Sequence, residues 1–306
     1  MTVSEISDTT RLERLRPPAG PVRMVLDTDT YNETDDQFAL AHAMLSPERL
    51  TVEAIYAAPF HNQRSDGPGH GMELSYRQIL RLLERLGRSA EGFAFRGSTG
   101  YLGRGGQPRE SDAVRDLVTR GLAGRDDDPL YVVAIGAITN VASALLTEPA
   151  LAEKIVVVWL GGHALSWPDT REFNLRQDVP AARVVLDCGV PLVLVPCMGV
   201  ASHLHTSVPE IDRYVAPHGE LGAFLASRLK EMRDDHFAWS KVMWDVATIA
   251  WLLDPAWVPT ELVPSPVVTD QVTWSVDRRR HLIRCASFVH RDPIFRDLFR
   301  KLAAAA

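Results

Sequence analysis

The most informative cluster of chemistry-bearing side chains surrounds the end of the first apolar segment of the sequence, residues 22–29. The five acids of this cluster are Asp27, Asp29, Glu33, Asp35 and Asp36. Carboxylates at such short spacing repel one another unless a positive charge is bound among them. A divalent cation with oxygen ligands, either Ca²⁺ or Mg²⁺, removes that repulsion. Capping of a helix that begins near Asp36 accounts for one or two of the acids only. The cluster therefore predicts a metal site.

The segments that must position these acids alternate between apolar, strand-like runs and amphipathic, helix-like runs. The predicted strands are residues 22–29, 50–58, 93–97, 130–136, 154–162 and 191–197. The predicted helices between them are residues 36–45, 74–86, 111–122, 140–146 and 180–187. Apolar strands that alternate with helices are typical of a mostly parallel central sheet flanked by helices on both faces. The predicted fold class is therefore α/β.

The C-terminal part of the chain has a more helical pattern. Residues 221–234 and 242–253 are predicted helices, and residues 272–276 are expected to form a hairpin with residues 281–288. No linker divides the chain, so residues 21–306 are expected to form a single α/β domain. The Pro- and Gly-rich segment 17–21 ends a polar stretch, so residues 1–20 are expected to be a mobile N-terminal tail.

Composition excludes several classes of protein. The formal net charge of −6 argues against a nucleic-acid partner, and the basic cluster at residues 278–280 is too short to follow a phosphate backbone. No apolar run reaches the length of a membrane span, and the first residues lack a signal segment. The three cysteines have no paired spacing, which favours reduced thiols. We therefore expect a soluble, cytoplasmic protein without a membrane partner.

Polar residues also follow the later strands. In open parallel sheets, ligands bind in the crevice beyond the carboxyl ends of the strands. Asn62 follows the second strand, and the main-chain carbonyls around Ile135 end the fourth. Two glycines at residues 161–162 end the fifth strand and allow a ligand to approach the backbone closely, although glycine is also common at ordinary turns.

Two further acids lie in the second half of the sequence. Glu172 and Asn174 flank a phenylalanine, and Asp245 follows Trp244 at the start of an apolar helix. An aspartate at a helix start is often only a cap. Together with the early acids, however, these residues outline carboxylates and amides around one pocket. Such a pocket suits a cation and a polyhydroxylated substrate.

The motifs resemble those of the inosine-uridine-preferring nucleoside hydrolases, in the same order along the chain. That family carries an Asp-x-Asp followed by an Asp-Asp pair, a Gly-x-x-Thr-Asn turn, a strand ending in Gly-Gly, a Glu-Phe-Asn tripeptide, and a late Asp ahead of an apolar helix ending in Asp-Pro. The matching residues here are Asp27 to Asp29, Asp35 and Asp36, Gly136 to Asn140, Gly161 and Gly162, Glu172 to Asn174, and Asp245 with Asp254 and Pro255. Six matches in order are more specific than any one of them.

The resemblance implies a nucleoside hydrolase-like fold and a role for each matching residue. The family binds one Ca²⁺, for which Asp29, Asp36, Asp245 and the carbonyl of Ile135 would be the protein ligands. Asp29 would also take a proton from the attacking water, and Asp27 would orient the metal ligands. Asp35 and Asn62 would bind the ribose 2′ side, Asn174 the 3′-hydroxyl, Glu172 the 5′-hydroxyl, and Trp244 the base.

The implied reaction is hydrolysis of the N-glycosidic bond of a ribonucleoside to free base and ribose, as in purine or pyrimidine salvage. Carboxylates around the sugar stabilise the developing oxocarbenium charge, and the metal makes a water more acidic. Because water attacks without a covalent intermediate, inversion at the anomeric carbon is expected. Related hydrolases are commonly homodimers or homotetramers, which the resemblance implies for this chain as well.

Two features depart from the family pattern. The spacing from Asp29 to Asp35 is two residues longer than usual, so Asn32 or Glu33 could join the ribose site. Family members also often place a histidine, which can protonate the departing base, where this chain has Trp244. Tryptophan is not an acid at neutral pH, so another group must assist the base. The candidates are His61, His163, His236 and Trp239. The preferred base is not predicted.

Two alternative functions remain open at this point. An Asp-x-Asp after an apolar strand also resembles the Mg²⁺-dependent phosphatases of haloacid dehalogenase type, but these need a lysine at a later strand end, and Lys154 begins a strand instead. The replacement of histidine by Trp244 alternatively suggests a catalytically weak homologue that binds a ribosyl ligand without turnover.

Overall fold

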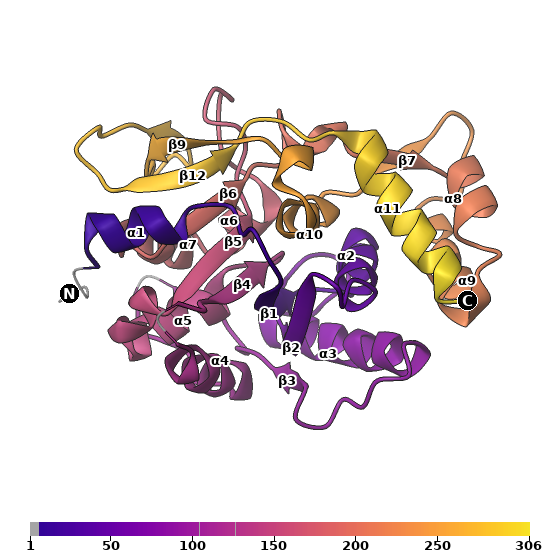
Figure 1. Cartoon of the computed structure of the whole chain (residues 1–306), viewed down its shortest axis with the longest axis horizontal. Helices are drawn as coiled ribbons and strands as arrows, with labels where there is room; N and C mark the ends of the chain where they lie inside the picture. Colours follow the sequence, from indigo (N-terminus) through magenta and orange to yellow (C-terminus); the bar gives the residue numbers. More distant parts are fainter. Residues whose placement is uncertain (1–5, 104, 126) are drawn as a thin grey trace.

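A computed structural model gives the fold of residues 6–103, 105–125 and 127–306 (Figure 1). Its centre is an eight-stranded sheet in the order β3-β2-β1-β4-β5-β6-β12-β9. The strands are β1 (Val22–Thr28), β2 (Leu50–Ala57), β3 (Ala94–Arg96), β4 (Leu130–Ala134), β5 (Ile155–Leu160), β6 (Leu192–Val195), β9 (Thr260–Pro264) and β12 (Leu282–Ala286). Neighbours from β3 to β12 are parallel, and β9 is antiparallel at the edge. The predicted mostly parallel α/β fold is confirmed.

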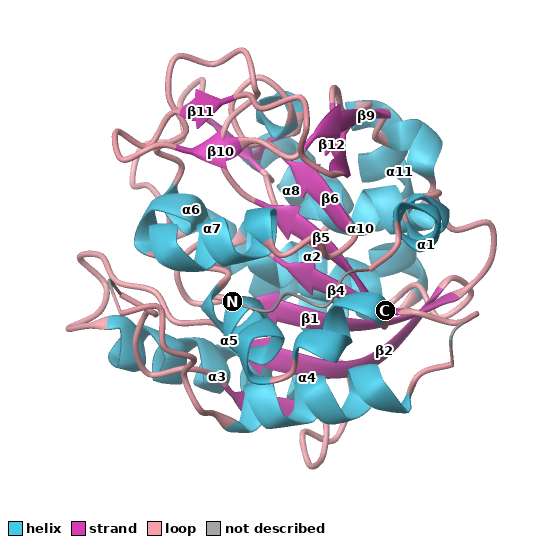
Figure 2. Ribbon diagram, turned by 90° about the vertical axis from the view of Figure 1, so that its left-hand side faces the viewer, coloured by secondary structure: helices cyan, strands magenta, loops and turns pink. Residues whose placement is uncertain are grey.

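Helices cover both faces of this sheet (Figure 2). The helices are α1 (Asp8–Arg14), α2 (Asp35–Met44), α3 (Pro68–Arg85), α4 (Asp112–Ala123), α5 (Thr139–Thr147), α6 (Phe173–Gln177), α7 (Val179–Asp187), α8 (Val208–Tyr214), α9 (Gly219–Lys230), α10 (Val246–Leu253) and α11 (Arg291–Ala304). Short 3₁₀ turns occupy Pro149–Glu153, Ala201–His203 and Pro255–Trp257. No helix of the described residues combines the length and apolar character that a bilayer crossing requires.

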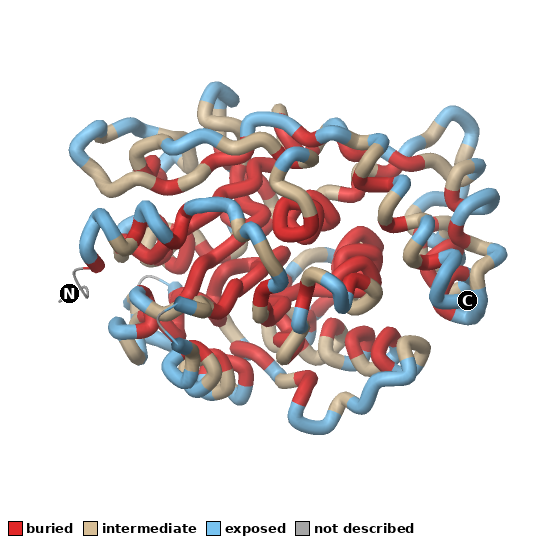
Figure 3. The backbone as a smooth tube through the Cα atoms, in the orientation of Figure 1, coloured by how far each residue is buried: buried red, intermediate tan, exposed pale blue. Residues whose placement is uncertain are grey.

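Alternating strand residues supply the two hydrophobic cores. Leu26 and Val133 pack on one face with helices α2, α3 and α10, whereas Val25 and Val132 pack on the other with α4, α5 and α7. A strand points successive side chains to opposite faces of the sheet, and helices cover both faces, so both sets of side chains are buried. This double burial explains why the strands are apolar without alternation in the sequence. Figure 3 shows the resulting buried centre, which includes the sheet, α2 and α10.

The sheet reverses its order between β1 and β4, and this reversal creates a crevice. From β1 the chain proceeds outward to β2 and β3, and then returns to the other side of β1 through β4. Asp27 pairs with Ala134 across these two strands, and Asp29 and Ile135 follow within two residues, beyond the carboxyl ends of β1 and β4. Ligands in open α/β sheets bind at such a topological switch point.

The predicted C-terminal hairpin is wrong. Strand β11 (Trp274–Ser275) pairs with β10 (Val267–Val268), while β12 joins the main sheet between β6 and β9. The two predicted hairpin arms were adjacent in sequence, but β12 gains more by extending the parallel sheet, where Ile283 is fully buried. A second small ribbon pairs β7 (His205–Ser207) with β8 (Ser240–Val242).

The first residues differ from the mobile tail expected for residues 1–20. Residues 1–5 lie outside the described residues, but α1 and Leu15 contact the loop before β6 and strand β12. The Arg11 Nε donates to the Gly189 carbonyl at 2.8 Å, and Arg284 Nε donates to the Leu15 carbonyl at 2.6 Å. Leu15 is fully buried. The packed part of the chain therefore begins well before residue 20, because Leu15 supplies an apolar anchor in an otherwise polar stretch.

Substitution of Gly97 by alanine should destabilise the fold next to the crevice. A Cβ at Gly97 would lie 2.0 Å from the Ala57 carbonyl oxygen and 2.5 Å from Nδ2 of Asn140. Overpacking of this kind costs about 1–3 kcal/mol, so Gly97→Ala should lower the melting temperature by several degrees. Gly20→Ala, where the new Cβ has no neighbour within 4 Å, is the control. Equal melting temperatures for the two variants would contradict this account of the packing.

Candidate active site

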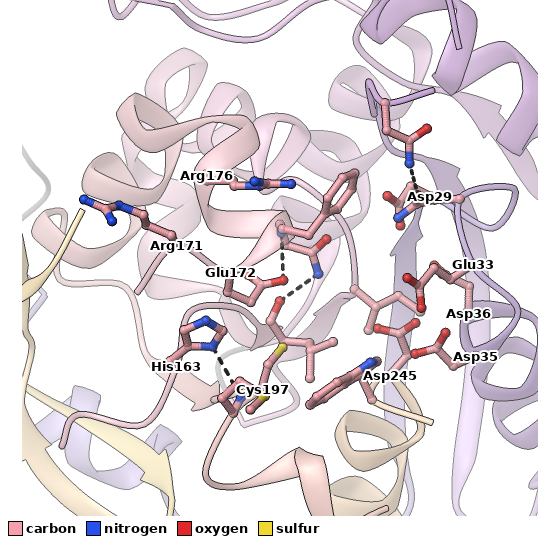
Figure 4. A pocket seen from close by; sticks show the side chains of 18 of the residues that line it. Asp29, Glu33, Asp35, Asp36, His163, Arg171, Glu172, Arg176, Cys197 and Asp245 are labelled. Atoms are coloured by element: carbon pink, nitrogen blue, oxygen red, sulfur yellow. Dashed lines mark hydrogen bonds between the residues drawn. The ribbon is translucent and has the colours of Figure 1, made fainter. Parts of the chain in front are cut away.

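A pocket of about 480 Å³ lies at the crevice beyond the carboxyl ends of the strands (Figure 4). This volume is within the usual range for small-molecule sites. Figure 4 shows the carboxylates of Asp29, Asp36 and Asp245 on one side, with Glu172 and Cys197 across from them. The lining residues are Asp29, Asn32, Glu33, Asp35, Asp36, Asn62, Gln63, Ile135, Leu160, His163, Arg171, Glu172, Phe173, Asn174, Arg176, Cys197, Met198, Trp244 and Asp245.

Two buried helices bring the early and late acids together. Residues 35–43 of α2 and all of α10 are buried, and the two helices pack against each other. Their N-terminal ends meet at the pocket, where carboxylate oxygens of Asp35, Asp36 and Asp245 all lie within 4.8 Å of one another. Helix N-termini carry partial positive charge, which favours carboxylates there. The chain thus assembles one acidic cluster from segments far apart in the sequence.

These acids do not act as ordinary helix caps. Asp245 occupies the N-cap position of α10, but its side chain accepts no capping hydrogen bond. Thr34, at the N-cap of α2, likewise makes no side-chain cap. The Asp36 Oδ1 instead accepts a hydrogen bond from Thr28 Oγ1 at 2.6 Å. The carboxylates of Asp36 and Asp245 therefore turn into the pocket, and the capping interpretation of Asp245 does not hold.

The electrostatics of the cluster favour a bound cation. Burial, followed by the charge of Asp36, raises the pKa of Asp29 well above its usual range. Burial and the neighbouring carboxylates raise the pKa of Asp245 in the same way, and burial raises that of Asp36 to about 7. Among the described residues, no basic side chain forms an ion pair with these three acids. The Asp29 Oδ2 is buried and has no hydrogen-bond partner.

The donor set fits a hard divalent ion. The side chains that converge here offer only carboxylate oxygens, which are the ligands that Ca²⁺ and Mg²⁺ prefer. A cation would relieve the mutual repulsion of the buried carboxylates and would provide a partner for Asp29 Oδ2. Ile135, whose carbonyl was predicted as a further ligand, lines the same pocket.

Asp27 lies behind the pocket lining. Its Oδ1 accepts a hydrogen bond from Asn140 Nδ2 at 2.7 Å, and Asn140 in turn accepts from the Ser98 amide and hydroxyl. Burial raises the pKa of Asp27 to about 7, and the Asn140 contact lowers it. The Thr-Asn turn of the sequence thus connects the first strand to the loop after β3. Asp27 therefore contacts structural groups and does not line the pocket.

Glu172 both caps α6 and lines the opposite wall of the pocket. Its carboxylate accepts hydrogen bonds from the amides of Asn174 at 2.8 Å, Leu175 at 2.9 Å and Gly162 at 3.0 Å. Burial raises the pKa of Glu172, and these hydrogen bonds lower it by a smaller amount. The Asn174 Nδ2 donates to the Leu160 carbonyl at 3.1 Å. The second glycine after β5 therefore fixes the orientation of the Glu-Phe-Asn segment.

The longer loop between Asp29 and Asp35 contributes directly to the pocket. Asn32 accepts a hydrogen bond from Asn62 Nδ2 at 2.7 Å, and both residues line the pocket. Glu33 lines it as well. The predicted participation of Asn32 or Glu33 is therefore consistent with their position, because the longer loop folds over the acidic side of the pocket.

Lys241 was not predicted as a site residue. Its ammonium donates hydrogen bonds to Glu33 Oε2 at 2.6 Å, to the Val242 carbonyl at 2.8 Å and to Asp35 Oδ1 at 3.0 Å. Burial lowers the pKa of Lys241, but the charges of Asp35 and Glu33 outweigh burial and raise it. One signal was available in the sequence: a lysine, scarce in this chain, stands four residues before Asp245.

Only one of the four candidates for assisting the base lines the pocket. This candidate is His163, which lies in the lining together with Trp244. The other three candidates do not line the pocket: His61, His236 and Trp239. The His163 Nδ1 accepts a hydrogen bond from the Met198 amide at 3.3 Å, which leaves Nε2 as the donor. Burial lowers the pKa of His163. The described residues thus retain a single half-buried imidazole in the pocket.

The family of this chain follows from a comparison over most of its length. The family model for the inosine-uridine preferring nucleoside hydrolases matches residues 24–293. The chain belongs to this family. The match includes every acid of the pocket, from the first strand to α10. The sequence-based identification of the family is confirmed, and so is the assignment of the chain as a ribonucleoside hydrolase enzyme.

Individual relatives agree with this family. The chain is 28% identical over 265 residues to the pyrimidine-specific ribonucleoside hydrolase RihA of Enterobacter sp. (strain 638), which covers 76% of this chain and 79% of RihA. It is 29% identical over 261 residues to the RihA of Salmonella typhimurium, with the same coverage of 76% and 79%.

Solved structures share the fold. A purine-preferring ribonucleoside hydrolase from Gardnerella vaginalis superposes with a TM-score of 0.75 at 20% identity and covers 92% of this chain and 98% of its own. A plant nucleoside hydrolase gives a TM-score of 0.73 at 20% identity, with coverage of 93% and 99%. The family membership leaves no support for the phosphatase alternative.

The pH dependence of stability should reveal the buried charge of Asp27 in chelator-treated protein. Because the folded pKa of about 7 lies above the unfolded value of 3.8, Asp27 stabilises the fold below about pH 4, and this contribution is lost as the pH rises to about 7. The Asp27→Asn side chain does not ionise, so the variant does not lose stability in this way as the pH rises. Its amide oxygen still accepts the hydrogen bond from Asn140. Relative to wild type, the unfolding free energy of Asp27→Asn should therefore increase by on the order of 2 kcal/mol between pH 5 and pH 8. The difference between the melting temperatures of the two proteins measures this change.

The comparison is internally controlled. The lowered pKa values of His42, His163 and His281 act in the opposite direction, because each prefers the neutral form in the folded state. These histidines are present in both proteins, so their effect cancels in the difference. A difference in melting temperature that is the same at pH 5 and pH 8 would show that Asp27 does not carry a raised pKa.

Proposed function

We propose that this chain cleaves the N-glycosidic bond of ribonucleosides to free base and ribose, with Ca²⁺ held in the acidic pocket. The observation that carries the proposal is that Asp29 lines the same pocket of about 480 Å³ as the buried cluster of Asp36 and Asp245, whose carboxylate oxygens lie within 4.8 Å of each other. The relatives' names include both pyrimidine-specific and purine-preferring enzymes, so the proposal names the ribonucleoside class and leaves the base to experiment.

The proposed metal ligands are Asp29, Asp36, Asp245 and the main-chain carbonyl of Ile135. Support comes from the raised pKa values of the three carboxyl groups and from the unpartnered Asp29 Oδ2. Ca²⁺ is preferred over Mg²⁺ because its larger coordination number accommodates sugar hydroxyls beside four protein oxygens. When bound, the ion supplies positive charge that orders the sugar diol and lowers the pKa of a nearby water.

The remaining pocket residues would bind the substrate. Asp35 and Asn62 would hold the 2′ side of the ribose, Asn174 the 3′-hydroxyl and Glu172 the 5′-hydroxyl. Asp35 and Asn62 line the acidic wall, whereas Glu172 and Asn174 line the opposite one, so a ribose between them contacts both. The base would extend toward Trp244, whose indole offers a stacking surface.

Asp29 would be the general base of the reaction. Its Oδ2 would take a proton from the attacking water as the glycosidic bond breaks, and the surrounding carboxylates would stabilise the positive charge that develops on the sugar. Water attacks the anomeric carbon directly, so the configuration there should invert. His163, a lining residue of the pocket, would donate a hydrogen bond from Nε2 to the departing base.

The wider context of the enzyme also remains a proposal. We propose that residues 21–306 act as one nucleoside hydrolase-like domain, which is supported by a single sheet whose strands extend from Val22 to Ala286. A cytoplasmic location and a homodimeric or homotetrameric assembly are proposed by similarity to the family.

Ribose release from a panel of purine and pyrimidine ribonucleosides tests the function. We expect release from at least one of them, loss of activity after chelation, and recovery with Ca²⁺ more than with Mg²⁺, because the ion orders the sugar diol and lowers the pKa of the attacking water, and Ca²⁺ accommodates more oxygen ligands than Mg²⁺. Ligand-dependent melting without product would instead indicate a binding homologue. Phosphate release from phosphate esters without ribose release would indicate a phosphatase.

Asp29→Asn separates catalysis from metal binding. The variant loses the proton acceptor but keeps an oxygen ligand, so kcat should fall by about 100-fold or more while part of the Ca²⁺ affinity remains. Asp36→Ala and Asp245→Ala should abolish Ca²⁺ binding in calorimetry. Asp254→Asn, which changes the cap of a short 3₁₀ turn, is the matched control. Unchanged kcat in Asp29→Asn would refute the role of Asp29 as the base.

A further inference from the structure

A buried ammonium stands directly behind the proposed ribose site. Lys241 lies in strand β8, where its backbone pairs with Thr206 of β7. Two contacts fix the end of the ribbon next to His205 and Val242: the Met243 amide donates to the Leu204 carbonyl at 2.8 Å, and Arg291 Nε donates to the His205 carbonyl at 2.6 Å. The side chain of Lys241 is only 10% exposed. A small antiparallel ribbon, distinct from the main sheet, thus sets the position of this amine.

The amine has no donor left for a substrate. A lysine ammonium has three hydrogen-bond donors. Here they contact Glu33 Oε2 at 2.6 Å, the Val242 carbonyl at 2.8 Å and Asp35 Oδ1 at 3.0 Å. Lys241 is also absent from the residues that line the pocket, whereas Asp35 and Glu33 both line it. Any influence of Lys241 on a bound sugar therefore acts through these two carboxylates.

Asp35 is the carboxylate that needs such a partner. Its side chain is 2% exposed and lies within 4.8 Å of the carboxylates of Asp36 and Asp245. Without a partner of opposite charge, the side chain of Asp35 would rotate away from these two carboxylates because of electrostatic repulsion. The Lys241 contact fixes one oxygen of Asp35, and Glu33 of the longer loop fixes the amine in turn. Charge-assisted contacts of this kind are stronger and more directional than neutral ones.

We propose that Lys241 is a positioning residue that fixes Asp35 for recognition of the ribose 2′-hydroxyl, with Glu33 of the longer loop as its anchor. This inference deepens the proposed function and rests on it. It assigns a role to the two-residue lengthening of the loop, because the loop brings Glu33 to the amine. The consequence is that discrimination between ribose and 2′-deoxyribose depends on a side chain that does not contact the sugar.

The test compares two ligands that differ only in the 2′-hydroxyl. The ribonucleoside that the wild-type enzyme hydrolyses best is assayed for kcat and KM at saturating Ca²⁺. The 2′-deoxyribonucleoside with the same base is assayed as a competitive inhibitor for Ki. In Lys241→Met, kcat/KM for the ribonucleoside should fall by about 10- to 100-fold, while Ki for the 2′-deoxy analogue should change by less than about threefold. Lys241→Arg should restore most of the loss, because it retains the charge.

Two further variants keep the test decisive. If the Lys241→Met protein does not fold, Lys241→Gln is used in its place. The glutamine side chain is shorter and uncharged, but it still offers a hydrogen-bond donor. Lys301→Met is the matched control, because the Lys301 ammonium also contacts two carboxylates, those of Glu48 and Asp297, and is 17% exposed. Lys301 lies on α11, away from the pocket lining, so its variant should leave both kcat/KM and Ki unchanged.

The outcomes separate the inference from the function on which it rests. Equal losses for the ribonucleoside and its 2′-deoxy analogue, or no loss for either, would overturn the positioning role of Lys241 while the hydrolase activity stands. A wild-type protein that releases ribose from no nucleoside would overturn the proposed function, and this role with it. A selective loss of the 2′-hydroxyl contribution, with recovery in Lys241→Arg, would support the assignment.

Discussion

The repulsion among buried carboxylates is the constraint on which the rest of this structure depends. Asp29, Asp36 and Asp245 are each almost inaccessible to solvent, and burial together with mutual charge raises the pKa of all three. A fold gains nothing in stability from such an arrangement on its own. The surrounding elements compensate in part, through the N-terminal ends of α2 and α10 and the hydroxyl of Thr28. The remaining imbalance of negative charge is the reason that we propose a cation site in this pocket.

The charge of the cluster is divided between two kinds of partner. Asp35 is paired with Lys241, a fixed cation supplied by the chain itself. Asp29, Asp36 and Asp245 form no ion pair with a basic side chain among the described residues, and a hard cation suits such carboxylates. The lysine therefore does not occupy the position of the ion. Of these four acids it pairs with Asp35 only, so Asp35, for which we propose a role in sugar recognition, is electrostatically distinct from the three acids that we propose as metal ligands.

The sequence was sufficient for the central fold and most of the pocket. The first six strands and most of the helices between them are predicted to within a few residues, because apolar strands and amphipathic helices differ in period. The exceptions are α3, which begins six residues before its predicted start at residue 74, and the short α6, which was not predicted. The pattern places Asp29 at a strand end and Asp36 and Asp245 at helix starts, which is where they lie, whereas the position of Glu172 at the start of α6 was not predicted. The pairing of β12 with β6 was not predicted, since strand partners far apart in sequence leave no local signal. Lys241 was missed for the same reason: its partners are more than 200 residues away.

The packing of α2 against α10 has a consequence for how the protein responds to its ion. The two halves of the acidic cluster belong to segments at opposite ends of the chain, so they meet only after the sheet and both helices have assembled. A partly folded chain presents at most one half of the cluster and binds a cation weakly. Free cation in the surroundings therefore selects the completed structure, and by mass action it adds to the free energy of unfolding in proportion to RT ln(1 + [L]/Kd).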